Sequence, residues 1–224
     1  MSWFSRVTIR ARNEAELRQL RALCGRPYAQ HQALWTLFDR LQGEEQPFLF
    51  RQMAGDANDE LCFLMVSDDP PETGRDWWRV ETKPYQPELR EGQRLRFNVC
   101  LNPTRTERLA RGRGKRQDYV MSRLHQLQVQ EARRAVERQR IIHEELPLWL
   151  AGRAASRGFE LESCLVDRFD VLRFPKGEHT VTLSVAEFSG ELRVVDPERL
   201  SDVLRRGMGH GQSFGLGLLL LKPR

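Results

Sequence analysis

The chain has 224 residues, of which 30% are charged and 40% are hydrophobic. This length accommodates one large or two small domains, and the hydrophobic content suffices for a buried core. The formal net charge of +5 permits a polyanionic partner without requiring one. The four cysteines are widely spaced and form no Cys-x-x-Cys pair, so the sequence indicates neither a zinc site nor a secreted disulfide scaffold.

The two ends of the chain carry no signal for a membrane or for export. Residues 1–6 lead directly into a predicted strand and lack the apolar core of a signal peptide. The longest apolar run, residues 216–221, is too short to cross a bilayer. We therefore expect a soluble protein of a reducing compartment, located in the cytoplasm, with no membrane partner.

The first half of the chain predicts one helix among several strands. Residues 5–10 alternate polar and apolar side chains, as a half-buried strand does. A helix is expected from Pro27, because proline favours the first helical position, and Gly43 is the expected stop. Further strands are predicted at residues 48–51, 61–66, 77–80 and 94–101.

The second half repeats this order more completely. It predicts a helix that ends at Gly158, a helix capped by Asp196, and strands at residues 161–174, 180–193 and 216–221. Strand–helix–strand–strand–helix–strand is the split βαβ, or ferredoxin-like, pattern. We therefore predict an α+β fold of two tandem ferredoxin-like domains, with boundaries at residues 1–102 and 117–224.

Two segments stand outside this pattern. Residues 103–116 carry six basic residues against one acid, which predicts a basic linker loop that either binds a polyanion or is simply solvated. Residues 123–145 are rich in helix formers, and their five arginines face four glutamates. Because this charge is nearly balanced, we predict a helical insertion at the surface rather than an arm that binds nucleic acid.

A glycine-rich loop is predicted at residues 207–217, directly after Arg205 and Arg206. Five of its residues are glycine, which indicates positive φ angles or a backbone that another group approaches closely. Bare amides beside two arginines suit an anion such as a phosphate chain. The alternative is a glycine-rich turn that joins a helix to a strand.

Among the five histidines, His31 has the sequence context that best suits chemistry. It lies in the first turn of the helix expected from Pro27, where unpaired amides attract phosphate, and Tyr28 falls on the same helix face. We expect its pKa at or below the reference value of about 6.5, which leaves neutral imidazole for proton transfer. The alternative is a histidine that only packs on Leu34 and Trp35. The sequence shows no metal-ligand cluster, nucleophile elbow or Walker motif.

Several of these segments together resemble one known family. They are PYAQHQALW at residues 27–35, LRFNVCLNP at 95–103, GKR at 114–116, FSGELRV at 188–194, and the glycine-rich loop. In this order, and over nearly the whole chain, the sequence resembles the CasE family, the CRISPR RNA-processing endoribonucleases of the type I-E Cascade complex.

The resemblance implies a metal-independent endoribonuclease that needs no cofactor. Such an enzyme cleaves precursor CRISPR RNA at the 3′ base of the repeat hairpin by attack of the ribose 2′-hydroxyl. It leaves a 2′,3′-cyclic phosphate and a 5′-hydroxyl, and it retains the mature guide RNA beside the other Cascade subunits. We expect the free protein to be a monomer.

The resemblance places the catalytic residues at His31 and Tyr28. Together with the basic residues noted above, it gives an expected set of RNA-binding residues: Arg105, Arg113, Lys115, Arg116, Arg173, Lys176, Arg205, Arg206, Gly207, Gly209, Gly211, Gln212, Gly215 and Gly217. Two features depart from the family pattern. Many members carry lysine or serine in place of Gln212, and residues 123–145 exceed the usual length, so their role stays open.

Three alternatives compete with this function. A protein of the same fold can bind RNA within a ribonucleoprotein complex without cutting it. A metal-dependent nuclease is disfavoured because carboxylates and histidines do not cluster in the sequence. An assembly subunit that does not bind RNA would use the basic segment for solubility alone.

Overall fold

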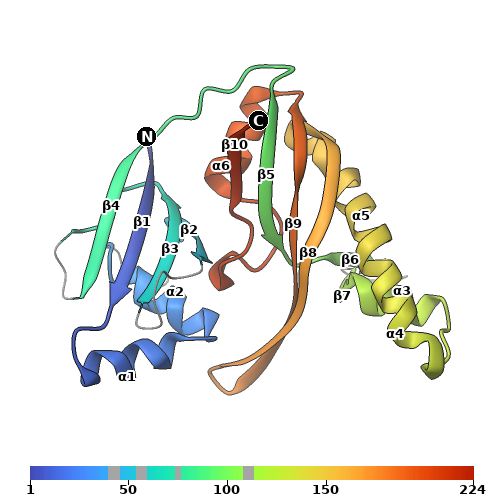
Figure 1. Ribbon diagram of the computed structural model, residues 1–224, viewed down its shortest axis with the longest axis horizontal. Helices are drawn as coiled ribbons and strands as arrows, with labels where there is room; N and C mark the ends of the chain where they lie inside the picture. The colour runs from blue at the N-terminus through green and yellow to red at the C-terminus, as the bar shows by residue number, and fades with distance from the viewer. Residues whose placement is uncertain (40–45, 54–59, 74–76, 108–113) are drawn as a thin grey trace. The chain divides into compact units, whose positions relative to one another are not determined.

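The computed structural model describes residues 1–39, 46–53, 60–73, 77–107 and 114–224 (Figure 1). The chain forms two compact units, and each contains several separate stretches of sequence. The first unit comprises Met1–Glu88, Phe174–Thr180 and Ser201–Leu219, and the second comprises Leu89–Arg173, Val181–Leu200 and Leu220–Arg224. The glycine-rich loop, which the sequence analysis assigned to the C-terminal domain, therefore belongs to the same unit as the N-terminal sheet.

The first unit is built on an antiparallel sheet of four strands in the order β2-β3-β1-β4. The central strand β1 pairs with both β3 and β4, so that Val7 lies opposite Phe63 on one side and Val80 on the other. This is the strand order of a ferredoxin-like domain. The strands are β1 (Ser2–Arg10), β2 (Phe48–Met53), β3 (Glu60–Ser67) and β4 (Trp78–Tyr85).

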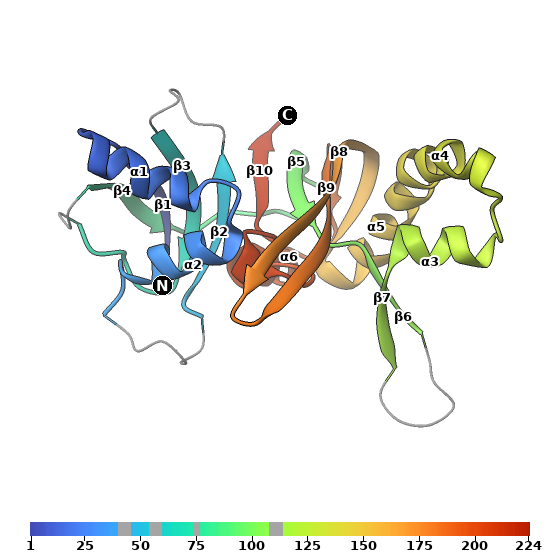
Figure 2. The ribbon, with the colours of Figure 1, turned by 90° about the horizontal axis from the view of Figure 1, so that it is seen from below.

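Helices α1 (Glu14–Leu23) and α2 (Pro27–Trp35) cover one face of this sheet (Figure 2). Helix α1 was not predicted from the sequence; it begins where the Asn13 side chain accepts a hydrogen bond from the Glu16 N–H at 2.9 Å. Helix α2 begins at Pro27 as predicted but ends at Trp35, before the predicted stop. The apolar side chains of both helices meet the inward residues of the strands in one core, which includes Val7, Ile9, Leu20, Leu34 and Phe63.

The second sheet has the order β10-β5-β9-β8, which is again the ferredoxin-like order. Strand β5 was assigned to the N-terminal half by the sequence analysis, and this assignment is corrected: β5 pairs with β9 along its whole length. Its alternating pattern identifies a strand but carries no information about the partner strand. The strands are β5 (Arg94–Leu101), β8 (Phe159–Lys176), β9 (His179–Val194) and β10 (Leu219–Pro223).

The two helices that complete the second ferredoxin-like pattern begin and end close to the predicted positions. Helix α5 (Leu146–Ala154) continues as the short helix η2 (Ala155–Arg157), which ends at Gly158 with a φ of 82°. Helix α6 (Pro197–Arg206) begins after Asp196, whose carboxylate accepts a hydrogen bond from the Arg199 N–H at 3.0 Å. The structure therefore confirms both helix ends predicted from the sequence: the end of the first helix at Gly158 and the start of the second after the N-cap Asp196.

The basic segment at residues 103–116 is not a linker loop at its two ends. Strand β6 (Thr104–Glu107) pairs antiparallel with β7 (Lys115–Asp118), and the hairpin projects from the second unit (Figure 2). The remaining residues of the segment, 108–113, lie outside the described residues. The two threonines of β6 favour a strand, a tendency that the high charge of the segment obscured in the sequence.

The predicted insertion at residues 123–145 is helical, as expected. It contains the second half of α3 (Tyr119–Gln126), then α4 (Glu131–Arg140) and the π-helix η1 (Ile141–Glu145), which runs directly into α5. The insertion is therefore an extension of the first helix of the second ferredoxin-like domain. Its inner side is buried at Leu124, Ile141 and Ile142.

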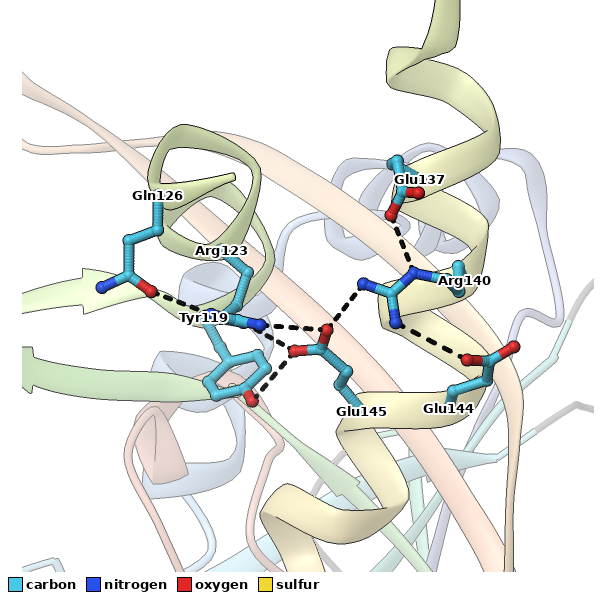
Figure 3. Close-up of polar contacts among 7 residues, drawn as sticks. All are labelled: Tyr119, Arg123, Gln126, Glu137, Arg140, Glu144 and Glu145. Atoms are coloured by element: carbon cyan, nitrogen blue, oxygen red, sulfur yellow. Dashed lines mark hydrogen bonds and ion pairs between the residues drawn. The ribbon is translucent and has the colours of Figure 1, made fainter. Parts of the chain in front are cut away.

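An ion-pair network joins α3 to the end of η1 (Figure 3). The Glu145 carboxylate accepts hydrogen bonds from Arg123 at 2.7 and 3.3 Å, from Arg140 at 2.9 Å, and from the Tyr119 hydroxyl at 3.4 Å. Hydrogen bonding from Arg123 lowers the pKa of Glu145; burial opposes this effect, while Arg140 supports it. These ion pairs link α3 to the end of η1 and so fix the packing of one helix against the next.

Within the described ranges, every helix is too short or too polar to span a bilayer. The four cysteines are free thiols.

Candidate functional site

The first turn of α2 brings Tyr28 and His31 together in the first unit. Pro27 occupies the first helical position, and its fixed φ starts the helix without a side-chain cap. Helical spacing then places the two side chains on one face, where their rings stack with centroids 6.4 Å apart and planes inclined by 26°. The juxtaposition of Tyr28 and His31 expected from the sequence is therefore present.

His31 is only partly exposed because aromatic rings surround it. The Trp35 ring meets it edge-on at 6.1 Å, and the rings of Phe48 and Phe50 from β2 lie 5.6 and 6.2 Å away. The sequence analysis treated packing on Trp35 as an alternative to a chemical role. The structure shows that His31 packs on Trp35 and also faces polar groups.

Two of these polar groups contact Nε2 of His31. The indole Nε1 of Trp35 donates a hydrogen bond to it at 3.0 Å, and Gln46 Oε1 lies 3.1 Å from it. The same Gln46 oxygen accepts a hydrogen bond from Ser213 Oγ at 2.9 Å. Through Gln46, the histidine is therefore connected to the short helix η3 (Gln212–Phe214) in the glycine-rich loop.

Lys176, at the end of β8, supplies a cation beside these rings. Its Nζ lies 5.2 Å from the centroid of the Tyr28 ring and 5.7 Å from that of Phe214, which itself packs edge-on against Phe174. Burial lowers the pKa of His31; the hydrogen bond with Gln46 opposes this effect and the charge of Lys176 adds to it. The direction agrees with the prediction, but the main cause is burial and not the end of the helix.

A cavity of about 470 Å³ in the first unit lies beside Gln46. Arg205 and Arg206, at the end of α6, line it together with Gln212, whose amide donates to the Arg206 carbonyl at 2.9 Å. Arg205 is partly neutralised by Asp202 at 2.8 Å. The expected anion-binding residues at this end of α6 therefore border a cavity that adjoins the polar partner of His31.

The five glycines of the loop all adopt positive φ, between 74° at Gly207 and 90° at Gly217. A Cβ at Gly217 would lie 2.6 Å from the Met208 carbonyl oxygen, so this position requires glycine on steric grounds as well. The remaining three, Gly209, Gly211 and Gly215, have φ angles of 79°, 88° and 78°. The turn geometry therefore accounts for the glycines by itself, without excluding a bound anion.

A second cationic cavity, of about 650 Å³, belongs to the second unit. It contains Arg116 from β7 and Arg173 from β8, and its rim includes the exposed apolar side chains of Met121 and Val171. Arg173 and Lys176, both expected to bind RNA, lie in different surroundings. Lys176 lies over the rings of Tyr28 and Phe214 in the first unit, whereas Arg173 lines this cavity together with Arg116.

The other basic residues expected to bind RNA lie on the β6–β7 hairpin. Arg105 is half-buried and Lys115 is exposed. The strand register pairs Lys115 with Glu107 and Arg116 with Thr106, so the two neighbouring basic residues point to opposite faces of the hairpin. Arg113 lies outside the described residues.

Sequence reasoning missed Gln46 and Ser213 as neighbours of His31. Gln46 lies fifteen positions after the histidine and Ser213 lies in the glycine-rich loop, so no local spacing connects them. Among the described residues, no group of three or more His, Cys, Asp or Glu side chains is arranged to hold a metal ion.

Comparison with known proteins identifies the family. A sequence model of the family described as CRISPR-associated protein matches residues 2–223, and the chain belongs to this family. It is 29% identical, over 238 aligned positions, to the CRISPR-associated endoribonuclease Cse3 of Thermus thermophilus; the alignment covers 99% of this chain and 100% of that protein.

Solved structures show the same fold. A structure of the endoribonuclease Cse3 bound to a 19-nucleotide RNA has a TM-score of 0.72 at 28% identity, with 99% of both chains covered. A second structure, of Thermus thermophilus Cse3 bound to an RNA that represents a pre-cleavage complex, has a TM-score of 0.71 at 27% identity and the same coverage. These matches confirm the prediction of tandem ferredoxin-like domains.

Proposed function

We propose that this protein is an endoribonuclease that cleaves precursor CRISPR RNA at the repeat hairpin. The observation that carries the proposal is the arrangement of His31, Tyr28 and Lys176 around one partly buried position. The similarity to an endoribonuclease over nearly the full chain supports it. A basic surface for the RNA backbone is available on each unit.

The proposed reaction uses the nucleophile of the RNA itself. The ribose 2′-hydroxyl attacks the adjacent phosphate, which requires in-line geometry, proton transfer and stabilisation of charge, but no metal ion. His31 exchanges a proton either with the 2′-hydroxyl or with the departing 5′-oxygen. Its lowered pKa favours the neutral imidazole, the form that a general base requires. The products are a 2′,3′-cyclic phosphate and a 5′-hydroxyl.

The neighbouring groups take supporting roles in this proposal. The ammonium group of Lys176 stabilises negative charge on the phosphate, and the Tyr28 hydroxyl donates a hydrogen bond to it or takes part in proton transfer. Arg205, Arg206 and the glycine-rich loop contact the RNA backbone in the first unit, and basic residues of the hairpin and the second cavity do so in the second: Arg105, Lys115, Arg116 and Arg173.

We further propose that the protein keeps its product and works with other subunits of a Cascade complex. The free protein is a cytoplasmic monomer in this view. Helix α4 presents Val136 to solvent and α5 presents Leu148, each 72% exposed, and such exposed apolar side chains suit a contact with another subunit.

One experiment separates this function from its main alternative, an RNA-binding subunit that does not cut. The purified protein is incubated with a CRISPR repeat RNA hairpin in excess chelator, and both binding and product ends are measured. Cleavage with a 2′,3′-cyclic phosphate end supports the proposal. Tight binding without any product would establish the non-catalytic alternative, and cleavage only when a divalent metal is restored would establish a metal-dependent nuclease.

A further inference from the structure

Two side chains contact the same nitrogen of His31, and they require different protonation states of that nitrogen. Trp35 Nε1 lies 3.0 Å from His31 Nε2, and Gln46 Oε1 lies 3.1 Å from it. An indole N–H only donates, so its contact requires Nε2 without a proton. An amide oxygen only accepts, so its contact requires a proton on Nε2. At any one time, Nε2 satisfies one of these two partners.

The orientation of the Gln46 amide is fixed by its other contacts. Its Nε2 donates to the Phe48 carbonyl at 2.5 Å, and its Oε1 accepts from Ser213 Oγ at 2.9 Å. A flipped amide would place its oxygen against the Phe48 carbonyl oxygen, which also only accepts. The oxygen is therefore the atom of Gln46 that faces His31.

The contacts at Nε2 decide where the neutral ring carries its proton. His31 Nδ1 is buried and finds no partner among the described residues, so it does not distinguish the two tautomers. With the proton on Nδ1, the indole N–H of Trp35 still donates to Nε2, and the Gln46 oxygen still accepts a hydrogen bond from the Ser213 hydroxyl. With the proton on Nε2, the indole N–H of Trp35, a residue only 7% exposed, loses its acceptor. The neutral ring therefore favours the proton on Nδ1.

We propose that Trp35 and Gln46 are paired positioning residues that stabilise opposite protonation states of His31, an inference that rests on the proposed catalytic role of this histidine. Trp35 holds the neutral ring with its proton on Nδ1. Gln46 accepts the Nε2 proton when the ring becomes charged. A general acid–base group must pass through both states in one reaction, and this pair supplies a hydrogen bond for each.

Few other groups near the ring can shift its proton equilibrium. The titratable side chains that face it from the described residues are Tyr28, on the same helix, and Lys176, at the end of β8. Strand β2 contributes the uncharged rings of Phe48 and Phe50. Because the variants described next leave Tyr28 and Lys176 in place, a change in the His31 pKa reports on Trp35 and Gln46.

The test is an NMR titration of the full-length protein labelled in its histidine rings, with the His31 signals assigned from the spectrum of His31→Ala. We expect the ¹⁵N shifts of the wild type to show a neutral His31 with its proton on Nδ1. Trp35→Phe should raise the His31 pKa and transfer part of the neutral population to the other tautomer. Gln46→Leu should lower the pKa, because it removes the acceptor for the charged form.

Trp149→Phe is the matched control, since it also removes one buried indole N–H, the donor to the Thr104 carbonyl at 3.0 Å. It should leave the His31 titration unchanged. Shifts of the same sign in Trp35→Phe and Gln46→Leu, or a wild-type neutral ring protonated on Nε2, would overturn the inference. Should Trp35→Phe fail to fold, the wild-type tautomer and the direction of the Gln46→Leu shift still decide it.

A parallel pH–rate profile of hairpin cleavage separates this inference from the proposed function. If both hold, the profile moves with the NMR pKa in each variant. NMR shifts without a matching change in the rate profile would refute the catalytic role of His31 and leave the two contacts standing. Unchanged NMR titrations beside intact cleavage would overturn the roles of Trp35 and Gln46 and leave the proposed function.

Discussion

The His31 position of the first unit and the Arg116 cavity of the second unit place their polar groups in different surroundings. His31 is enclosed by aromatic rings, and burial lowers its pKa; the hydrogen bond with Gln46 opposes this effect and the nearby charge of Lys176 adds to it. The cavity of the second unit is lined by Arg116 and Arg173, by the acid Asp118, and by polar and exposed apolar side chains. An enclosed titratable group suits chemistry, whereas open arginines suit attachment to phosphate. The predictions below test this division of roles.

The largest effect is expected at His31. His31→Ala should slow single-turnover cleavage by roughly 10²–10⁴-fold, the usual loss for a proton-transfer group, while hairpin affinity is retained. His125→Ala, at an exposed position on α3, is the control and should cleave normally. Cleavage by His31→Ala at the wild-type rate would show that His31 is not a catalytic residue.

The pH dependence of the wild type then tells which proton His31 transfers. Because the pKa of His31 is lowered, a rate that depends on His31 as a general base should fall to half its maximum at a pH below the ordinary histidine pKa of about 6.5. A general acid gives the opposite profile, in which the rate declines as the pH rises through the same region. We expect the general-base profile. Single-turnover rates measured from about pH 5 to about pH 8, on both sides of the ordinary histidine pKa, check this expectation.

The next effect concerns the helices that support the second cavity. Glu145→Gln should lower the free energy of unfolding by about 1–3 kcal/mol, because Arg123 and Arg140 lose their charged partner. Glu144→Gln is the matched control: its carboxylate is 67% exposed and lies 3.5 Å from Arg140, so about 0.5 kcal/mol or less is expected. Equal losses in denaturant titrations would show that the network adds nothing beyond a surface ion pair.

The same network has a defined pH dependence. The pKa of Glu145 is lowered in the folded protein, so the unfolded chain binds its proton at a higher pH than the folded one. The contribution of Glu145 to stability is therefore present above the ordinary glutamate pKa of about 4.3 and is lost as the pH falls through the lowered value. In Glu145→Gln this part of the acid destabilisation should be missing.

A moderate effect on binding is expected from the β6–β7 hairpin. Replacing Lys115 and Arg116 together by alanine should weaken hairpin binding and reduce the slope of log affinity against log salt by about one unit or more. Since the two residues point to opposite faces, we expect Arg116→Ala alone to account for most of the change. Arg18→Ala on α1 removes one charge and is the net-charge control for Arg116→Ala. A slope unchanged from wild type in the double variant would mean that the hairpin is merely solvated.

A small effect on the cleavage rate is expected at Tyr28. Tyr28→Phe removes one hydrogen bond to phosphate and should slow cleavage by roughly tenfold or less; a loss as large as that of His31→Ala would assign proton transfer to the phenol. Its binding affinity should change little.

Gly211 tests the role of the glycine-rich loop. Because its φ is 88°, Gly211→Ala should lower the melting temperature whether or not RNA contacts the loop, at a cost of about 1 kcal/mol. Gly211→Asn adds a Cβ but tolerates this φ better. If RNA approaches the backbone closely, both variants should lose hairpin affinity per folded molecule; affinity losses that merely track stability would identify a turn.

The sequence alone determined the elements whose signals are local. Asp196 before Pro197 and Gly158 after α5 fix helix ends through hydrogen bonds and φ angles of single residues, and both were predicted correctly. The Tyr28–His31 juxtaposition also follows from helical spacing. The order of the predicted strands and helices indicated the fold class, and the resemblance to the CasE family, carried by residues across the chain, indicated the family.

Only the tertiary structure decided which distant residues meet. Strand pairing placed β5 beside β9, and the register of β6 with β7 turned a presumed loop into a hairpin, because a strand pattern does not encode its partner. The neighbours of His31, namely Gln46, Ser213 and Lys176, come from separate segments and were brought together by packing alone. The protonation of a partly buried imidazole depends on such contacts, so it is a property of the folded chain.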